Sequence, residues 1–216
     1  MATQHLDLEE QEQLDQLKAF WARWGNALTW LAIVVLGAYA AWNGWQYYQR
    51  AQATQAAQLF GEMQAAASAN DADKVVRVLQ DMQAHVGSTA LMNHARMLAA
   101  KTLVDAGRDA AAREQWQALM KDTDDQGLRA SAALRLSALD MQAKAWDQAL
   151  NQLKGAWPES YAGLMADRRG DILQAKGQAS EAVQAYQQAY AALPKDAAYR
   201  QMVAVKLNAL GVEAKE

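Results

Sequence analysis

The sequence contains no cysteine and only two prolines, Pro158 and Pro194, in 216 residues. The absence of cysteine excludes disulfide bonds, thiol catalysis and cysteine-rich zinc sites, and it fits an oxidising compartment as well as a reducing one. With so few prolines and so much alanine, little interrupts long helices. No window shows the strict alternation of polar and apolar residues that marks a half-buried strand. The composition therefore predicts an all-α protein.

Residues that could carry chemistry are also few. The three histidines are His5, His85 and His94, and none belongs to an H-E-x-x-H or similar metal-binding arrangement. The segment DTDDQG at residues 122–127 begins like a calcium loop, but Ala133 stands where the bidentate glutamate should be. No nucleophile elbow, P-loop or dinucleotide fingerprint is present. We therefore expect no catalytic residue, metal or cofactor, and we interpret the chain as a non-enzyme.

An excess of basic residues is missing as well, since the formal net charge is -3 at pH 7. Five acids and two bases precede Trp24, which leaves 19 acids and 19 bases in the rest of the chain. An electrically neutral body lacks the positive field that holds phosphate backbones. We therefore expect no nucleic-acid partner.

The longest stretch without a charged residue runs from Trp24 to Gln49. As a helix, its 26 residues would reach roughly 39 Å, more than the roughly 30 Å of bilayer hydrocarbon. Aromatic rings, which favour the headgroup layer, gather at both ends of the stretch. These rings belong to Trp21 and Trp24 on one side and to Trp45, Tyr47 and Tyr48 on the other. The stretch therefore predicts one transmembrane helix in a lipid bilayer.

Two other interpretations of this stretch fit less well. A buried helix of a soluble domain seldom needs so long an uncharged run with aromatic residues at both ends. Residues 38–40 have the A-x-A form of a signal cleavage site, but export signals start with a short basic segment, whereas this leader is long and acidic.

The orientation of the predicted helix follows from the basic residues at its ends. Lys18 and Arg23 precede the stretch and only Arg50 follows it closely, which favours a cytoplasmic N-terminus.

Small residues recur at four-residue intervals within the predicted membrane helix. Gly37 pairs with Ala41, and Ala40 pairs with Gly44. Such spacing presents a shallow face to a neighbouring membrane helix, although glycine and alanine are common in membrane helices generally. The pattern marks a candidate helix-packing face and names no partner.

The region after the membrane stretch contains an internal repeat. In ADRRGDILQAKGQASEAVQAYQQAYAALPKD, at residues 166–196, six positions follow the spacing of a tetratricopeptide repeat. These positions are Gly170, Gly177, Ala182, Tyr186, Ala189 and Pro194. Small residues let two antiparallel helices approach closely, the aromatic ring fills the gap between repeats, and proline ends the second helix.

Two weaker copies of this pattern lie upstream. Their landmarks are Gly107, Ala112 and Trp116 in one copy and Ala149, Leu153 and Ala156 in the other. An earlier segment, residues 51–86, keeps helical periodicity around a turn near Asn70 and Asp71. One hairpin cannot bury its apolar side alone, so the hairpins must stack. We predict a single N-terminal transmembrane helix followed by a tetratricopeptide-like helical-repeat solenoid of four hairpins.

A final helix, at residues 196–210, is predicted to cap this solenoid. Its expected buried stripe consists of Tyr199, Met202, Val203, Leu207 and Leu210. Arg200 and Lys206 are expected to face water.

The first helices of the hairpins are predicted to line a concave groove, as in other solenoids of this kind. The candidate residues for binding peptide or protein there are Met97, Val104, Leu134, Ala138, Met141 and Leu164, with Asp167, Asp171 and Gln174 further along. Flexible methionine and leucine side chains can accept extended or partly folded apolar peptides. The same residues can instead pack between helices, and both interpretations stay open at this point.

The order of these features resembles one family, the YfgM-type ancillary subunit of the bacterial Sec translocon. The resemblance rests on EEQEQLDQLKAFWARWGNALTW at residues 9–30, ADRRGDILQAKGQASEA at 166–182 and MVAVKLNALG at 202–211. It implies a single-pass protein of the bacterial inner membrane with its N-terminus in the cytoplasm. The corresponding division of the chain is an acidic cytoplasmic tail at 1–23, a transmembrane helix at 24–49 and a periplasmic repeat domain at 50–216.

The resemblance also implies partners. These are the SecYEG translocon and a membrane-anchored periplasmic chaperone of the peptidyl-prolyl isomerase type. The implied role is to assist secreted or outer-membrane client proteins as they emerge from the channel, and the family offers no catalytic residue to transfer. An alternative function for the same anchor and repeats is a membrane-anchored structural adaptor for envelope assembly or division.

Overall fold

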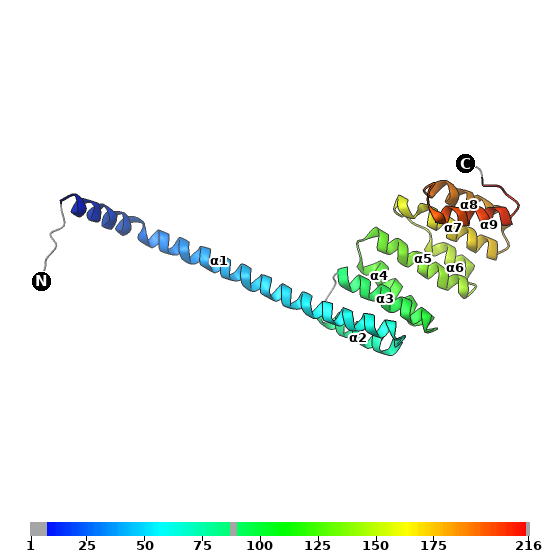
Figure 1. Cartoon of the computed structure of the whole chain (residues 1–216), viewed down its shortest axis with the longest axis horizontal. Helices are drawn as coiled ribbons and strands as arrows, with labels where there is room; N and C mark the ends of the chain where they lie inside the picture. The colour runs from blue at the N-terminus through cyan, green and yellow to red at the C-terminus, as the bar shows by residue number, and fades with distance from the viewer. Residues whose placement is uncertain (1–7, 87–89, 215–216) are drawn as a thin grey trace. The chain divides into compact units, whose positions relative to one another are not determined.

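The computed structural model describes residues 8–86 and 90–214, and every regular element in these ranges is an α-helix. The helices are α1 (Leu8–Ser68), α2 (Ala72–His85), α3 (Ala90–Asp105), α4 (Asp109–Asp122), α5 (Gln126–Gln142), α6 (Trp146–Gln152), α7 (Glu159–Ala175), α8 (Ala179–Ala192) and α9 (Ala198–Ala209) (Figure 1). The chain divides into two units, Met1–Thr54 and Gln55–Glu216. The prediction of an all-α protein is confirmed.

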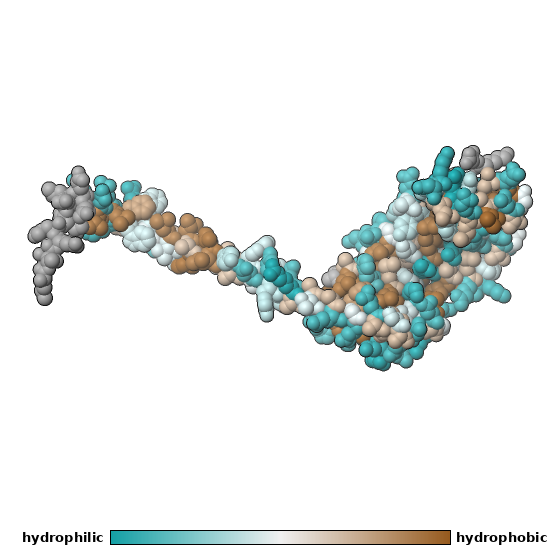
Figure 2. Space-filling view, viewed as in Figure 1, coloured by the Kyte–Doolittle hydropathy of each residue, from teal (hydrophilic) through white to brown (hydrophobic). Residues whose placement is uncertain are grey.

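Helix α1 carries a segment that is long and apolar enough to cross a membrane. Over its most apolar 18 residues the mean hydropathy is 1.4, and only 6% of that window is buried. Trp30 is 64% exposed and Leu36 is 66% exposed, and Figure 2 shows the hydrophobic side chains along this helix. Since exposed apolar surface of this extent is unfavourable in water, the segment fits a lipid environment.

The backbone of α1 does not mark the ends of the predicted membrane segment. The helix passes without interruption through residues 23–24 and 49–50. Its C-terminal part forms the first helix of the first hairpin, because Met63 packs in one apolar cluster with Leu79 of α2. The part of α1 from Gln55 onward therefore belongs to the repeat unit.

The turn after α1 lies where the sequence predicts it. Asn70 takes the left-handed conformation with a φ of 56°, which asparagine adopts more readily than most residues. The carboxylate of Asp71 then accepts a hydrogen bond from the backbone N–H of Lys74 at 2.9 Å and so caps the start of α2.

Three further hairpins follow, α3–α4, α5–α6 and α7–α8, and α9 packs against α8. The repeat landmarks that the structure buries, each at most 4% exposed, are Ala112, Trp116, Ala149, Leu153, Ala182, Tyr186 and Ala189. Successive hairpins stack side by side in Figure 1. The prediction of four hairpins with a C-terminal capping helix is confirmed.

Two glycines of α7 lie close to α8 and to Leu193, the residue that follows it. A Cβ atom on Gly170 would lie 2.5 Å from the ring of Tyr186, and one on Gly163 would lie 2.7 Å from the Leu193 side chain. A larger residue at either position would therefore require the neighbouring side chain or helix to shift. The small residue and the aromatic ring perform the packing roles that the repeat pattern predicts.

One predicted landmark is wrong. Helix α6 already ends at Gln152, so Ala156 is exposed in the following loop instead of lying in a second helix like Ala189. Gly155 has a φ of 141°, which is incompatible with continuing the helix. The indole Nε1 of Trp157 donates to the Leu153 carbonyl oxygen at 3.0 Å and holds the loop against the end of α6.

Candidate functional site

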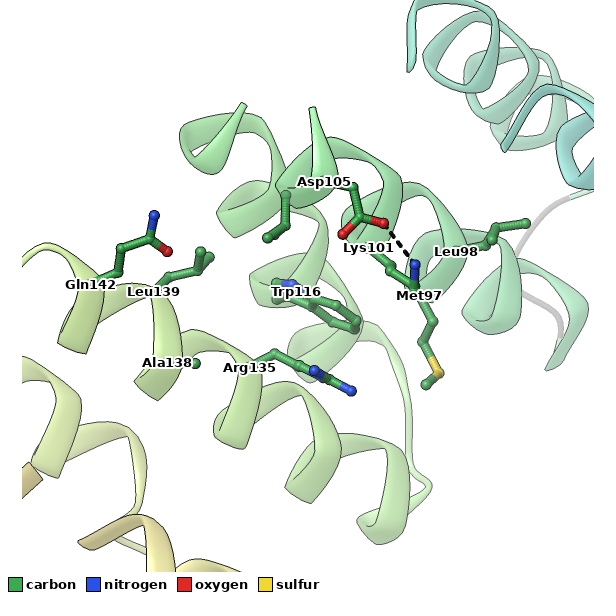
Figure 3. A pocket seen from close by; sticks show the side chains of 10 residues that line it. Met97, Leu98, Lys101, Asp105, Trp116, Arg135, Ala138, Leu139 and Gln142 are labelled. Atoms are coloured by element: carbon green, nitrogen blue, oxygen red, sulfur yellow. Dashed lines mark hydrogen bonds and ion pairs between the residues drawn. The ribbon is translucent and has the colours of Figure 1, made fainter. Parts of the chain in front are cut away.

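A pocket lies between the inner helices α3 and α5, which both pack on α4 (Figure 3). Its volume is about 370 Å³, within the range of protein ligand sites. The lining residues are Met97, Leu98, Lys101, Val104 and Asp105 of α3, Trp116 of α4, and Arg135, Ala138, Leu139 and Gln142 of α5. The pocket is therefore mainly apolar, with polar groups from both inner helices.

The helical repeat brings these side chains together. Residues 97, 101 and 104 are spaced by four and three, so they share one face of α3, and residues 135, 138 and 142 share one face of α5 in the same way. Trp116 comes from α4 and is only 4% exposed. Figure 3 shows its ring between the side chains of α3 and those of α5.

The charges around this pocket do not balance. Lys101 Nζ donates to Asp105 Oδ2 at 2.7 Å, and the two side chains stay 71% and 50% exposed. Arg135 is exposed and has no hydrogen-bond or ion-pair partner among the described residues. Figure 3 shows its guanidinium group turned toward Met97. One uncompensated positive charge thus stands beside the apolar wall.

The structure brings together three of the six groove candidates, Met97, Val104 and Ala138. Leu134 and Met141 are half-buried and pack against the core cluster that contains Leu153 and Ile172. Leu164 is half-buried in α7 and does not line the pocket between α3 and α5. A peptide-binding role for any of the six stays a prediction.

The sequence analysis did not single out Leu98, Trp116, Arg135, Leu139, Asp105 or Gln142 as groove residues. One signal was available in α5, because Arg135 lies three residues before Ala138 and Gln142 four residues after it. This spacing defines a face rotated by one residue from the one that Leu134 and Met141 share. Trp116 could not be found by such spacing, since it reaches the pocket from another helix.

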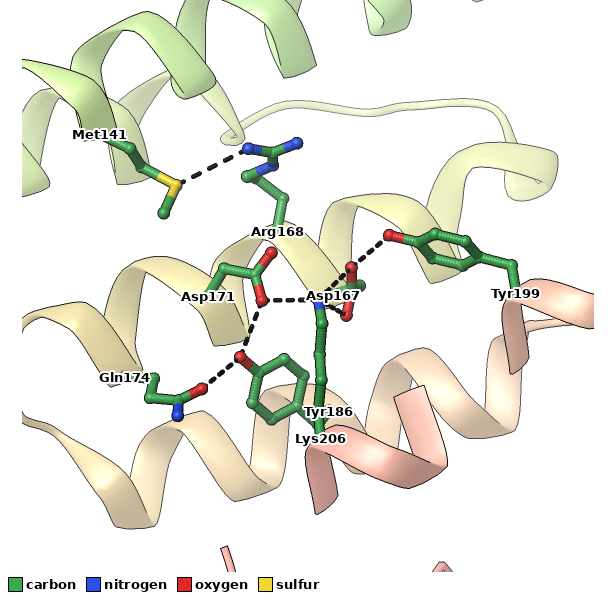
Figure 4. Close-up of polar contacts among 8 residues, drawn as sticks. All are labelled: Met141, Asp167, Arg168, Asp171, Gln174, Tyr186, Tyr199 and Lys206. Atoms are coloured by element: carbon green, nitrogen blue, oxygen red, sulfur yellow. Dashed lines mark hydrogen bonds and ion pairs between the residues drawn. The ribbon is translucent and has the colours of Figure 1, made fainter. Parts of the chain in front are cut away.

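The inner face of α7 is covered by the capping helix. Asp167 of α7 is 2% exposed, and the Lys206 ammonium of α9 lies 2.7 Å from its Oδ1. Lys206 also donates to Asp171 Oδ1 at 2.6 Å, and the Tyr199 hydroxyl donates to Asp167 Oδ2 at 2.5 Å. In Figure 4 the Lys206 ammonium stands between the two carboxylates. The predicted groove residues Asp167 and Asp171 therefore bind α9.

This arrangement corrects two expectations for α9. Lys206 turns inward to the carboxylates and does not face water, because Asp167 would otherwise be buried without a positive partner. Val203 and Leu207 are fully buried as expected, but Met202 is 54% exposed and Tyr199 is 36% exposed. The buried stripe is narrower than predicted, since polar contacts take over part of the interface.

Two tyrosines in this cluster have perturbed titration. Burial raises the pKa of Tyr186 above its usual value, and the hydrogen bond to Asp171 adds to the effect. Burial and the hydrogen bond to Asp167 raise the pKa of Tyr199 in the same direction. The Tyr186 hydroxyl also lies 2.8 Å from Gln174 Oε1. Both phenols therefore act as neutral hydrogen-bond donors to carboxylates at neutral pH.

Comparison with known proteins agrees with this architecture. Residues 18–212 match the family described as tetratricopeptide repeat-like domain. A relative from Neisseria gonorrhoeae, named ancillary SecYEG translocon subunit, is 30% identical over 207 residues, which cover 94% of this chain and 98% of that protein. The chain belongs to this translocon-subunit family. A relative of the same name from Escherichia coli is 33% identical over 115 residues, 52% of this chain and 54% of that protein. The resemblance seen in the sequence is confirmed.

The predicted membrane helix-packing face of this family member lies on α1. Gly37, Ala40, Ala41 and Gly44 are all exposed, and a Cβ atom on Gly37 or Gly44 would meet no atom within 4 Å. The use of this face in helix packing stays a prediction. Elsewhere in residues 8–86 and 90–214, no group of three histidine or acidic side chains is placed to hold a metal ion.

Proposed function

We propose that the chain is a non-enzymatic ancillary subunit of the Sec translocon in the bacterial inner membrane. The observation that carries the proposal is the 30% identity, over 94% of the chain, to a relative named for that role. The exposed apolar segment of α1 supports a membrane anchor. The repeat unit supports binding without turnover, because it offers packed helices and an apolar pocket.

In this proposal the N-terminus is cytoplasmic, residues 24–49 cross the membrane and residues 50–216 lie in the periplasm. The distribution of Lys18, Arg23 and Arg50 supports this orientation. A reporter that is active only after export, fused after Glu216, should be active. Activity of a reporter that works only in the cytoplasm, fused at the same position, would show that the proposed orientation is wrong.

The repeat domain would scaffold a membrane-anchored periplasmic chaperone of the peptidyl-prolyl isomerase type. The pocket between α3 and α5 would receive an apolar side chain from a secreted or outer-membrane client as it leaves the channel. Support comes from the apolar lining around Met97, Val104 and Ala138. The small face of α1, at Gly37 and Gly44, would lie against a neighbouring membrane helix.

The test of this function combines purification with site-specific crosslinking in intact cells. The chain, isolated in mild detergent at its native level, should bring SecY and a periplasmic chaperone with it. Absence of both would reject the translocon role and favour the envelope-adaptor alternative. A photocrosslinker at Ala138 should capture emerging secreted chains more strongly than one at Val205, an apolar α9 position that is 66% exposed. Equal capture at Ala138 and Val205 would show that the pocket is not the binding site for emerging chains.

A further inference from the structure

We propose that the pocket between α3 and α5 selects segments in which an acidic side chain stands next to a large apolar side chain. This inference rests on the proposed binding function and specifies the occupant of the same pocket. It follows from two independent properties of the lining, its apolar floor and its unbalanced charge.

The floor provides the apolar anchor site. The ring of Trp116 is almost fully buried and packs in one apolar cluster with Val104 and Leu139. The volume of about 370 Å³ lies at the lower end of the range for ligand sites, which suits one large side chain with its adjoining backbone. An aromatic or long aliphatic side chain gains most by leaving water here.

The charges around the pocket provide the selection. Lys101 and Asp105 neutralise each other at 2.7 Å, so they favour neither sign of charge in an incoming segment. Arg135 has no such partner among the described residues. A guanidinium group binds a carboxylate through two parallel hydrogen bonds, whereas a lysine placed beside it is repelled. An occupant with a carboxylate beside its apolar anchor therefore completes the charge pattern.

The size of the selection follows from the exposure of Arg135. Ion pairs at exposed positions contribute little in water and are screened by salt. We expect a glutamate beside the anchor to bind about two- to fivefold more tightly than a glutamine at low ionic strength. The preference should shrink as salt is added, because the apolar contribution stays while the ionic one is screened.

The experiment uses the full chain in detergent and three fluorescent peptides with one central tryptophan. The peptides differ only in the next residue, which is glutamate, glutamine or lysine, and binding is measured by fluorescence anisotropy. The expected order of affinity is glutamate, then glutamine, then lysine. Arg135→Gln should bring the glutamate and glutamine peptides to equal affinity, and Arg135→Lys should keep the order.

A matched control is Arg169→Gln. Arg169 is likewise exposed but lines a different pocket, beside Trp157. This change should leave the order of the three peptides as it is in the unaltered protein. Loss of the preference in Arg169→Gln would assign it to the overall charge of the domain and overturn the role of Arg135.

Two variants that fill the pocket test peptide binding separately from the selection for an acidic residue. Ala138→Trp, and Gln142→Trp at an exposed position of the lining, should each abolish binding of all three peptides while helical content persists. If neither reduces binding, or if the unaltered protein binds no peptide, the pocket function and the inference both fail. If all three peptides bind equally well and Arg135→Gln changes nothing, the pocket function stands and the acidic selection is overturned.

Discussion

Helices α3 and α7 are each the first helix of a hairpin in the repeat unit, yet the inner face of one is open and that of the other is covered. The face of α3 borders an apolar pocket that also includes Arg135 of α5, which has no ion-pair partner among the described residues. The face of α7 carries Asp167 and Asp171, and α9 covers both through Lys206. In this comparison, the inner face that carries two acids is paired with the capping helix, and the inner face that borders the apolar pocket is not.

The middle of the repeat unit also contains a buried acid, but helix α9 does not pair with it. Asp140 of α5 is 1% exposed and does not line the pocket. Its carboxylate lies 2.7 Å from Arg113 Nη1 of α4 and accepts a hydrogen bond from Gln152 Nε2 of α6 at 3.0 Å. This acid thus has a positive partner within the α4–α6 stack, although its Oδ1 accepts no hydrogen bond from the described residues.

The largest effect is expected from removing the Lys206 ammonium, the positive charge through which α9 covers the inner face of α7. Lys206→Met leaves Asp167 buried beside Asp171 without its positive partner, so we expect the free energy of unfolding to fall by about 3 kcal/mol. Thermal unfolding of the full chain in detergent, followed by circular dichroism, measures the loss. The matched variant Lys176→Met gives up an exposed partner, Asp147, and should barely change the melting temperature. Equal behaviour of the two variants would contradict the closing role of Lys206.

The second prediction tests the close packing between α7 and α8, the hairpin that α9 covers. Gly170→Ala places a methyl group against the Tyr186 ring, and overpacking of this kind costs about 1–3 kcal/mol. Gly61→Ala is the control, because its Cβ meets no atom within 4 Å in helix α1. That change should stabilise the helix by about 0.5–1 kcal/mol. Chemical denaturation of both variants checks the opposite signs, and a neutral Gly170→Ala would show that the hairpin can relax.

The smallest expected effect is a pH dependence confined to the covered end. The raised pKa of Tyr199 means that the fold requires the neutral phenol, whereas the unfolded chain ionises near a pKa of 10.0. The contribution is complete below pH 10 and is lost as the pH rises further. The melting temperature of the unaltered chain should therefore fall more steeply above pH 10 than that of Tyr199→Phe. If the melting temperatures of the two proteins fall equally with pH, Tyr199 does not cause the pH dependence.

Local patterns in the sequence predict most of the architecture. The uncharged run predicts an apolar helix, because its length and end residues are properties of one continuous segment. Gly170 and Tyr186 predict the α7–α8 hairpin, because their spacing matches a repeat whose packing is fixed within about 34 residues. Met97 and Val104 could be placed on the inner face of α3 for the same reason, since helical period alone sets which residues share a face.

The tertiary structure decided which of these faces remain open. Helical period cannot say whether Lys206 meets water or Asp167, because the two residues are 39 positions apart and meet only when α9 docks. It cannot bring Trp116 of α4 under the pocket between α3 and α5, since that depends on how three helices stack. The sequence by itself thus determined the long apolar helix, the hairpins and their order through local periodicity. Burial and charge pairing between distant residues determined where the capping helix covers the solenoid and where an inner face stays open.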